Sequence, residues 1–152
     1  MSEHERAYKD ELSRALEKCQ FIEETLKECI LSAIEIARME VSQHFPIKYK
    51  VSDISKLPLS PLVKAFEKIN EDSVLHQQLR EITKERNMVA HQSLLFTIGE
   101  LENEAHMSDA TLEMKRITDR ATEIHHQVLD FRYQLIRAVN AVKRNQNRGS
   151  EC

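Results

Sequence analysis

The 152-residue sequence has few of the residues that interrupt helices, with only two glycines and three prolines. It has no tryptophan, whereas 31% of its residues are charged. Glycine and proline mark most turns, so their scarcity excludes a fold with many short elements and frequent turns. The composition instead predicts a helical protein with long elements and few connections.

The three cysteines do not form a disulfide framework. Cys19 and Cys29 lie ten residues apart on one predicted helix, which separates them by about 15 Å, too far for a disulfide within that helix. Cys152 is the terminal residue. The charged start, Ser-Glu-His-Glu-Arg, does not resemble a signal peptide, and no run of about 18 apolar residues occurs. We therefore expect reduced thiols in a soluble, cytoplasmic protein that does not enter a membrane.

The net charge and the motifs of the sequence restrict the possible ligands and cofactors further. A net charge of −3 argues against an extended basic face for duplex DNA, although a small RNA-cutting site needs only a few local cations. The sequence has no Cys-x-x-Cys, Walker loop or dinucleotide fingerprint. Glu123-x-x-His126 matches half of a di-iron motif, but no second Glu-x-x-His is present. We expect neither a cofactor nor a metal.

Apolar residues at intervals of three and four predict one long first helix. It begins at a capping box formed by Ser2 and Glu5 and ends near Phe45-Pro46. Its apolar stripe consists of Tyr8, Leu12, Ala15, Cys19, Ile22, Leu26, Ile30, Ala33, Ala37 and Val41. Residues 46–59 have the composition of a connection, and Ser60 begins a short helix.

Two further helices follow in the predicted order. An inner helix begins at Asp72 or Ser73, and the last helix begins at Ser108. Residues 94–107 between them suggest a small β-hairpin, with Gly99 at its turn. The stripe of the last helix consists of Leu112, Ile117, Ala121, Ile124, Val128, Phe131, Leu135, Ala138 and Val142. We expect this helix to pair antiparallel with the first.

These elements predict an all-α fold. It is an antiparallel helical bundle with long N- and C-terminal helices, two shorter inner helices and a small β-hairpin. Residues 1–145 form a single helical domain, and residues 146–152 form a disordered basic and polar tail.

The best-supported candidate for a catalytic or binding site is the segment Lys84 to Gln92. The apolar row of the inner helix, Leu75, Leu79 and Ile82, continues with Arg86 and Val89. A cation in a buried row needs an anionic partner, so Arg86 should face a carboxylate, a subunit interface or a phosphate. His91 follows five residues later, about 140° round an ideal helix. Either the helix ends or bends near His91, or a second subunit completes the site.

Arginine and histidine at this spacing suit RNA cleavage without a metal. Arginine holds a phosphate by two parallel hydrogen bonds and stabilises the charge that develops on it. Histidine takes a proton from a ribose 2′-hydroxyl or gives one to the leaving oxygen. The pattern of an arginine and a histidine separated by four to six residues also occurs at Arg38 with His44, which we interpret as a capping histidine, and at Arg120 with His125 and His126 on the solvated flank of the last helix.

The segment Arg-Asn-Met-Val-Ala-His at residues 86–91 resembles the signature of the HEPN superfamily, in which an arginine followed by a polar residue precedes a histidine by four to six positions. The order of elements is similar too, with a long first helix, the motif after an inner helix, and a long final helix. The resemblance implies a helical homodimer in which two motifs meet across a two-fold axis. It also implies catalytic roles for Arg86, Asn87 and His91.

Members of this superfamily are often metal-independent endoribonucleases of toxin-antitoxin or anti-phage systems. Arg86 would bind the scissile phosphate, His91 would transfer the proton, and Asn87 would orient the phosphate or the histidine, leaving a 2′,3′-cyclic phosphate. The implied partners are an RNA substrate, a second copy and an antitoxin or regulatory protein. Two alternatives remain open: a non-catalytic helical module that binds RNA, a nucleotide or a protein, and a purely structural coiled-coil-like dimer.

Overall fold

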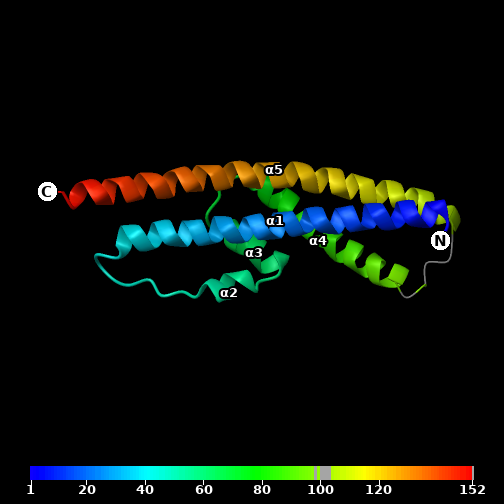
Figure 1. Ribbon diagram of the computed structural model, residues 1–152, viewed down its shortest axis with the longest axis horizontal. Coiled ribbons are helices and arrows are strands. Elements are labelled where there is room, and N and C mark those ends of the chain that lie inside the picture. Colours follow the sequence, from blue (N-terminus) through cyan, green and yellow to red (C-terminus); the bar gives the residue numbers. More distant parts are fainter. Residues whose placement is uncertain (98, 100–103, 152) are drawn as a thin grey trace. The chain divides into compact units, whose positions relative to one another are not determined.

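The computed structural model describes the chain except residues 98, 100–103 and 152. Most of the described residues are helical, and there is no strand among them. The helices are α1 (Glu3–Val41), α2 (Val51–Ser55), α3 (Leu59–Phe66), α4 (Ser73–Thr97) and α5 (Glu104–Gly149). The predicted all-α class and the two long terminal helices are confirmed (Figure 1).

Helix α1 begins at the predicted capping box. The Glu5 backbone N–H donates to Ser2 Oγ, and the Ser2 backbone N–H donates to the Glu5 carboxylate, so both donors are satisfied reciprocally. The predicted stripe is buried from Tyr8 to Ile30. The helix ends at Val41, four residues earlier than Phe45, and the next turn is closed by the backbone N–H groups of His44 and Phe45, which donate to Val41.

The chain forms two compact units. Unit 1 comprises residues 1–22 and 73–126, and unit 2 comprises residues 23–72 and 127–152. Unit 1 therefore contains the first part of α1, all of α4 and the first part of α5, and unit 2 contains the rest of α1 and α5 with α2 and α3. Arg86, Asn87 and His91 belong to unit 1.

In unit 1, α4 runs antiparallel to its neighbours. The rings of Tyr8 and Phe96 lie 5.8 Å apart, and the charges of Glu85 and Arg86 act on Cys19 further along α1. An ion pair between Glu85 and Arg120 joins α4 to α5. The core combines the buried residues Tyr8, Leu12, Ala15, Cys19, Ile22, Leu75, Leu79, Ile82, Val89, Met107, Met114, Ile117, Ala121 and Ile124.

In unit 2, α1 and α5 run in the same direction, so the predicted antiparallel pairing of the two long helices is wrong (Figure 1). Glu28 pairs with Arg132, and further along both helices Gln146 Nε2 donates to the Met39 carbonyl at 3.0 Å. Helix α3 begins at Leu59, with Pro58 rather than Ser60 at its N-cap, and buries Phe66 against Phe131 in an edge-to-face contact of 5.3 Å.

The predicted β-hairpin is also wrong where the structure describes it. Residues 94–97 are the last turn of α4, and residues 104–107 are the first turn of α5. Phe96 follows Val89 and Ser93 at helical spacing, and its ring packs on Tyr8. A continued helix therefore places Phe96 on the same face as Val89, where this contact forms. The expected connection at residues 98 and 100–103 lies outside the described residues; Gly99 has a positive φ of 75°.

Helix α5 differs from its predicted limits. It begins at Glu104, four residues before Ser108, and continues to Gly149, so residues 146–149 are helical. Leu112 is 53% exposed, whereas Met114 is buried. Met114 lies three residues before the buried Ile117, while Leu112 lies five residues before it and so falls about 140° from the stripe.

Candidate functional site

Arg86 interrupts the buried row of α4 as the sequence predicts. Leu79, Ile82 and Val89 are buried around it, and the Arg86 side chain is half-buried. No carboxylate in the described part of the chain forms an ion pair with it. Its Nη1 donates to Asn87 Oδ1 at 3.4 Å, a long hydrogen bond. The guanidinium is thus linked to the next residue in sequence and keeps most of its donors for another ligand.

Asn87 and His91 lie on the outward face of α4. Both are exposed, and they are four residues apart, so their side chains share one face of the helix about one turn from each other. Met88 and Leu94 flank them and are 40% and 59% exposed. Within the described residues His91 makes no hydrogen bond or ion pair. This face therefore presents an amide and an imidazole with apolar side chains beside them.

A single chain does not bring Arg86 and His91 together. Helix α4 continues six residues beyond His91 to Thr97, so it does not end at the histidine. Five residues of regular helix separate the two side chains by about 140°. The hydrogen bond to Asn87 links the guanidinium to a residue on the outward face, but His91 of the same chain stays on another side of the helix from Arg86.

The three arginine and histidine pairs differ in how the arginine is satisfied. Arg38 is held by Glu35 through two hydrogen bonds, Nε to Oε2 at 3.0 Å and Nη2 to Oε1 at 2.6 Å. Arg120 is paired with Glu85. Of the three arginines, Arg86 is the one that pairs with no carboxylate in the described ranges. The structure thus separates the motif from the two other matches, which spacing alone does not.

Glu85 is a feature that the sequence interpretation missed. Its Oε2 atom is buried without a hydrogen-bond partner among the described residues. Burial raises the pKa of this carboxyl, and the nearby Arg120 opposes the rise. Glu85 lies three residues after the buried Ile82, so its position on the flank of the apolar row was a signal that it would lie at the contact with α5.

Burial shifts the pKa of two other titratable groups in unit 1. Burial raises the pKa of the Cys19 thiol to about 11, although the Arg86 charge acts in the opposite direction. Burial also lowers the pKa of His125, which stacks on Phe21 with ring centroids 5.8 Å apart. A thiol with so high a pKa is a poor nucleophile at neutral pH, so Cys19 does not supply a nucleophile.

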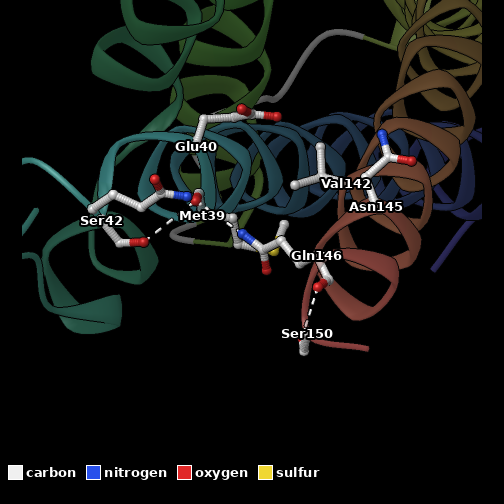
Figure 2. A pocket seen from close by; sticks show the side chains of 9 residues that line it. Met39, Glu40, Ser42, Val142, Asn145, Gln146 and Ser150 are labelled. Carbon is white, nitrogen blue, oxygen red and sulfur yellow. Dashed lines mark hydrogen bonds between the residues drawn. The ribbon is translucent and has the colours of Figure 1, made fainter. Parts of the chain in front are cut away.

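A hollow of about 660 Å³ lies in unit 2, away from the motif. It lies at the C-terminal ends of α1 and α5, where Figure 2 shows Ser42 and Gln146 with their hydrogen bonds to the Met39 carbonyl. Ser150 Oγ donates to the Gln146 carbonyl at 2.8 Å. Apart from Glu40, its lining is uncharged, composed of amides, hydroxyls and apolar groups. Such a lining offers no pair of groups for proton transfer.

The described residues contain no group of three or more histidine, cysteine, aspartate or glutamate side chains placed to hold a metal ion. Over the same residues, no helix carries an apolar stretch of the length needed to cross a bilayer. Comparison of the chain with protein-family models, with curated proteins and with solved structures gives no match.

Proposed function

We propose that this protein is a metal-independent endoribonuclease of HEPN type that acts as a homodimer. The observation that carries the proposal is the state of Arg86, a half-buried cation that pairs with no carboxylate in the described chain, while the arginines of the two similar patterns do. A phosphate supplies the anion that this position lacks. The exposed Asn87 and His91 lie within one turn on the adjacent face.

A second copy completes the site in this proposal. Two outward faces of α4 that meet across a two-fold axis bury Met88 and Leu94 of both chains, and such an interface is self-complementary. His91 of one copy then approaches Arg86 and Asn87 of the other. This arrangement removes the 140° separation that a single helix imposes.

The chemistry follows from these groups. Arg86 binds the scissile phosphodiester and stabilises the negative charge that develops on its oxygens. Asn87 holds the guanidinium, and His91 removes the proton from the ribose 2′-hydroxyl. The 2′-oxygen forms a bond to phosphorus, the bond from phosphorus to the 5′-oxygen breaks, and that oxygen takes a proton from solvent. The products are a 2′,3′-cyclic phosphate and a 5′-hydroxyl. A cytoplasmic toxin or anti-phage effector, restrained by an antitoxin or regulatory protein, is the setting we propose.

Cleavage of total RNA and tRNA in EDTA tests the proposal. We expect cutting by the wild-type protein and a loss of at least about a hundredfold in His91→Ala and in Arg86→Ala, the usual scale for removing an acid-base group. His126→Ala and Arg116→Ala are the matched controls, since both residues are exposed on α5 outside the site. Cutting that survives in both site variants, or that stops in EDTA, would remove the proposal.

Mixing the two inactive variants tests the shared site. A mixed dimer of Arg86→Ala and His91→Ala retains one intact arginine and one intact histidine on opposite copies. Random assortment then restores about a quarter of the wild-type activity if the site crosses the interface, because half of the dimers carry one of two sites. A mixture as inactive as its components shows that each chain uses its own Arg86 and His91.

A further inference from the structure

A second hollow in unit 2, of about 610 Å³, is lined by the end of α1 and the segment that follows it. Arg38 contributes from α1, and Lys48, Tyr49 and Lys50 contribute from the connection before α2. The sequence predicts only a connection over residues 46–59. The volume lies in the range of pockets that hold small molecules rather than whole protein segments.

The two lysines of this hollow carry unbalanced charge. Lys48 and Lys50 are exposed, and neither forms an ion pair with any residue that the structure describes. Arg38 is held in place by Glu35. The carboxylate of Asp53 accepts the Lys50 backbone N–H at 3.3 Å. The lining of the hollow thus carries three cationic side chains, Arg38, Lys48 and Lys50, and one carboxylate, that of Asp53, in a chain whose net charge is −3.

Tyr49 adds an aromatic surface between the two lysines. It is half-buried and lines the same hollow, and its phenol lies near enough to Arg38 to help raise the pKa of the guanidinium, after the larger effect of Glu35. Aromatic rings placed among cations bind single strands, because bases stack on the rings while the cations neutralise backbone phosphates.

We propose that this hollow binds single-stranded nucleic acid, with backbone phosphates at Lys48 and Lys50 and a base against Tyr49. The half-buried ring of Tyr49 fits a stacked base, and the exposed side chains of Lys48 and Lys50 fit the phosphates on either side of it. Val51 and Phe45 are 57% and 58% exposed beside them, so the vesicle measurement below tests a membrane surface as the alternative. The proposal does not depend on the nuclease activity: the hollow belongs to unit 2, and the Arg86 motif belongs to unit 1.

Oligonucleotide binding tests the hollow in the His91→Ala background and in EDTA, so that cleavage plays no part. Anisotropy of labelled single-stranded RNA and DNA is measured from 50 to 200 mM salt. Neutralising two phosphate contacts gives a salt slope of about 1.4, or about sevenfold weaker binding across this range. We expect Lys48→Gln/Lys50→Gln to lose that slope. The control Lys9→Gln/Lys115→Gln removes the same charge from exposed positions in unit 1 and should keep it.

Substitutions of Tyr49 distinguish base stacking from attraction by charge alone. We expect Tyr49→Phe to bind as the parent does and Tyr49→Ala to bind roughly tenfold more weakly, because only the ring is needed for stacking; circular dichroism verifies that both fold. Equal weakening by the two lysine pairs would reduce the effect to net charge and overturn the proposal. The proposal would also be overturned if the parent protein bound phosphatidylcholine–phosphatidylserine vesicles but not the oligonucleotides.

Discussion

Replacing Arg86 by methionine should stabilise the protein while abolishing the proposed activity. Arg86 occupies the buried row of α4 between Ile82 and Val89 and pairs with no carboxylate in the described ranges. A half-buried cation without an ion partner is desolvated with little return. Methionine has a similar length, carries no charge and adapts to irregular gaps. If the role of Arg86 is to bind a phosphate, its replacement removes the desolvation cost of the guanidinium from the folded state.

The expected size follows from how far the side chain is covered. Full burial of a methionine side chain contributes about 1.5 to 3 kcal/mol, so a half-buried methionine contributes about 1 kcal/mol, part of which the apolar stem of Arg86 already provides. Removal of the desolvated charge adds to the remainder, and we expect a net gain of about 1 kcal/mol. For a chain of 152 residues, that corresponds to a rise in Tm of about 2 to 4 °C. With an m-value of about 2 kcal/mol/M, the urea midpoint rises by about 0.5 M.

Urea unfolding followed by circular dichroism at fixed protein concentration measures this change, since dimerisation makes stability depend on concentration. Arg116→Met is the control, because Arg116 is 73% exposed and pairs only with its helical neighbour Glu113; its midpoint should not move. Loss of more than about 1 kcal/mol in Arg86→Met, at an unchanged m-value, would refute the reasoning and identify Arg86 as a structural anchor.

Three further outcomes follow from single contacts. Burial raises the pKa of the Cys19 thiol to about 11 and of the Cys29 thiol to about 12, so in a Cys152→Ser background thiol reagents should label both only through opening. We expect mass spectrometry to show much slower labelling of both thiols in the folded protein than in urea-unfolded protein, and equal rates in the two states would contradict this. Glu85 has a pKa raised by burial above its ordinary 4.5, so the folded state binds its proton more tightly than the unfolded state. Its contribution to stability is greatest at low pH and falls as pH rises through the raised pKa. Urea midpoints from pH 4 to 7 should show a decline that Glu85→Gln reduces; identical profiles would contradict it. The edge-to-face contact of Phe66 with Phe131 predicts a coupling of about 0.5 to 1.5 kcal/mol in a double-mutant cycle with leucine at each position, and additive losses would rule it out.

The helices could be predicted from the sequence because their apolar spacing is regular. The stripe from Tyr8 to Ile30 is buried as predicted, and so is the row of α4 on either side of Arg86. The stripe of α5 failed at Leu112, where the apolar residue lies off the helical period and Met114 replaces it. The prediction of a hairpin was wrong because local β propensity is a weaker signal than the helical spacing of Val89, Ser93 and Phe96. The contact between Phe96 and Tyr8 stabilises the helical arrangement.

The direction of α5 could have been derived by following the chain. Helix α4 is antiparallel to α1, and a short connection makes α5 antiparallel to α4, so two reversals restore the direction of α1. Pairing the two longest apolar stripes as an antiparallel hairpin ignored the helix between them. Connection length constrains consecutive helices, and α1 and α5 are not consecutive.

The sequence could predict only those parts of the site whose partners lie within the same chain. A cation in an apolar row predicts that an anion must meet it, and Arg86 stays unpaired by any carboxylate in the described chain, while Glu35 and Glu85 neutralise Arg38 and Arg120. Each of the latter pairs joins residues of the same chain, so packing can reveal it. The partner of Arg86 is then either outside the described residues or in another molecule. If Arg86→Met is more stable and no longer cleaves RNA, the partner of Arg86 is in the substrate. A partner within the fold would be left unpaired by this substitution, and the protein would become less stable.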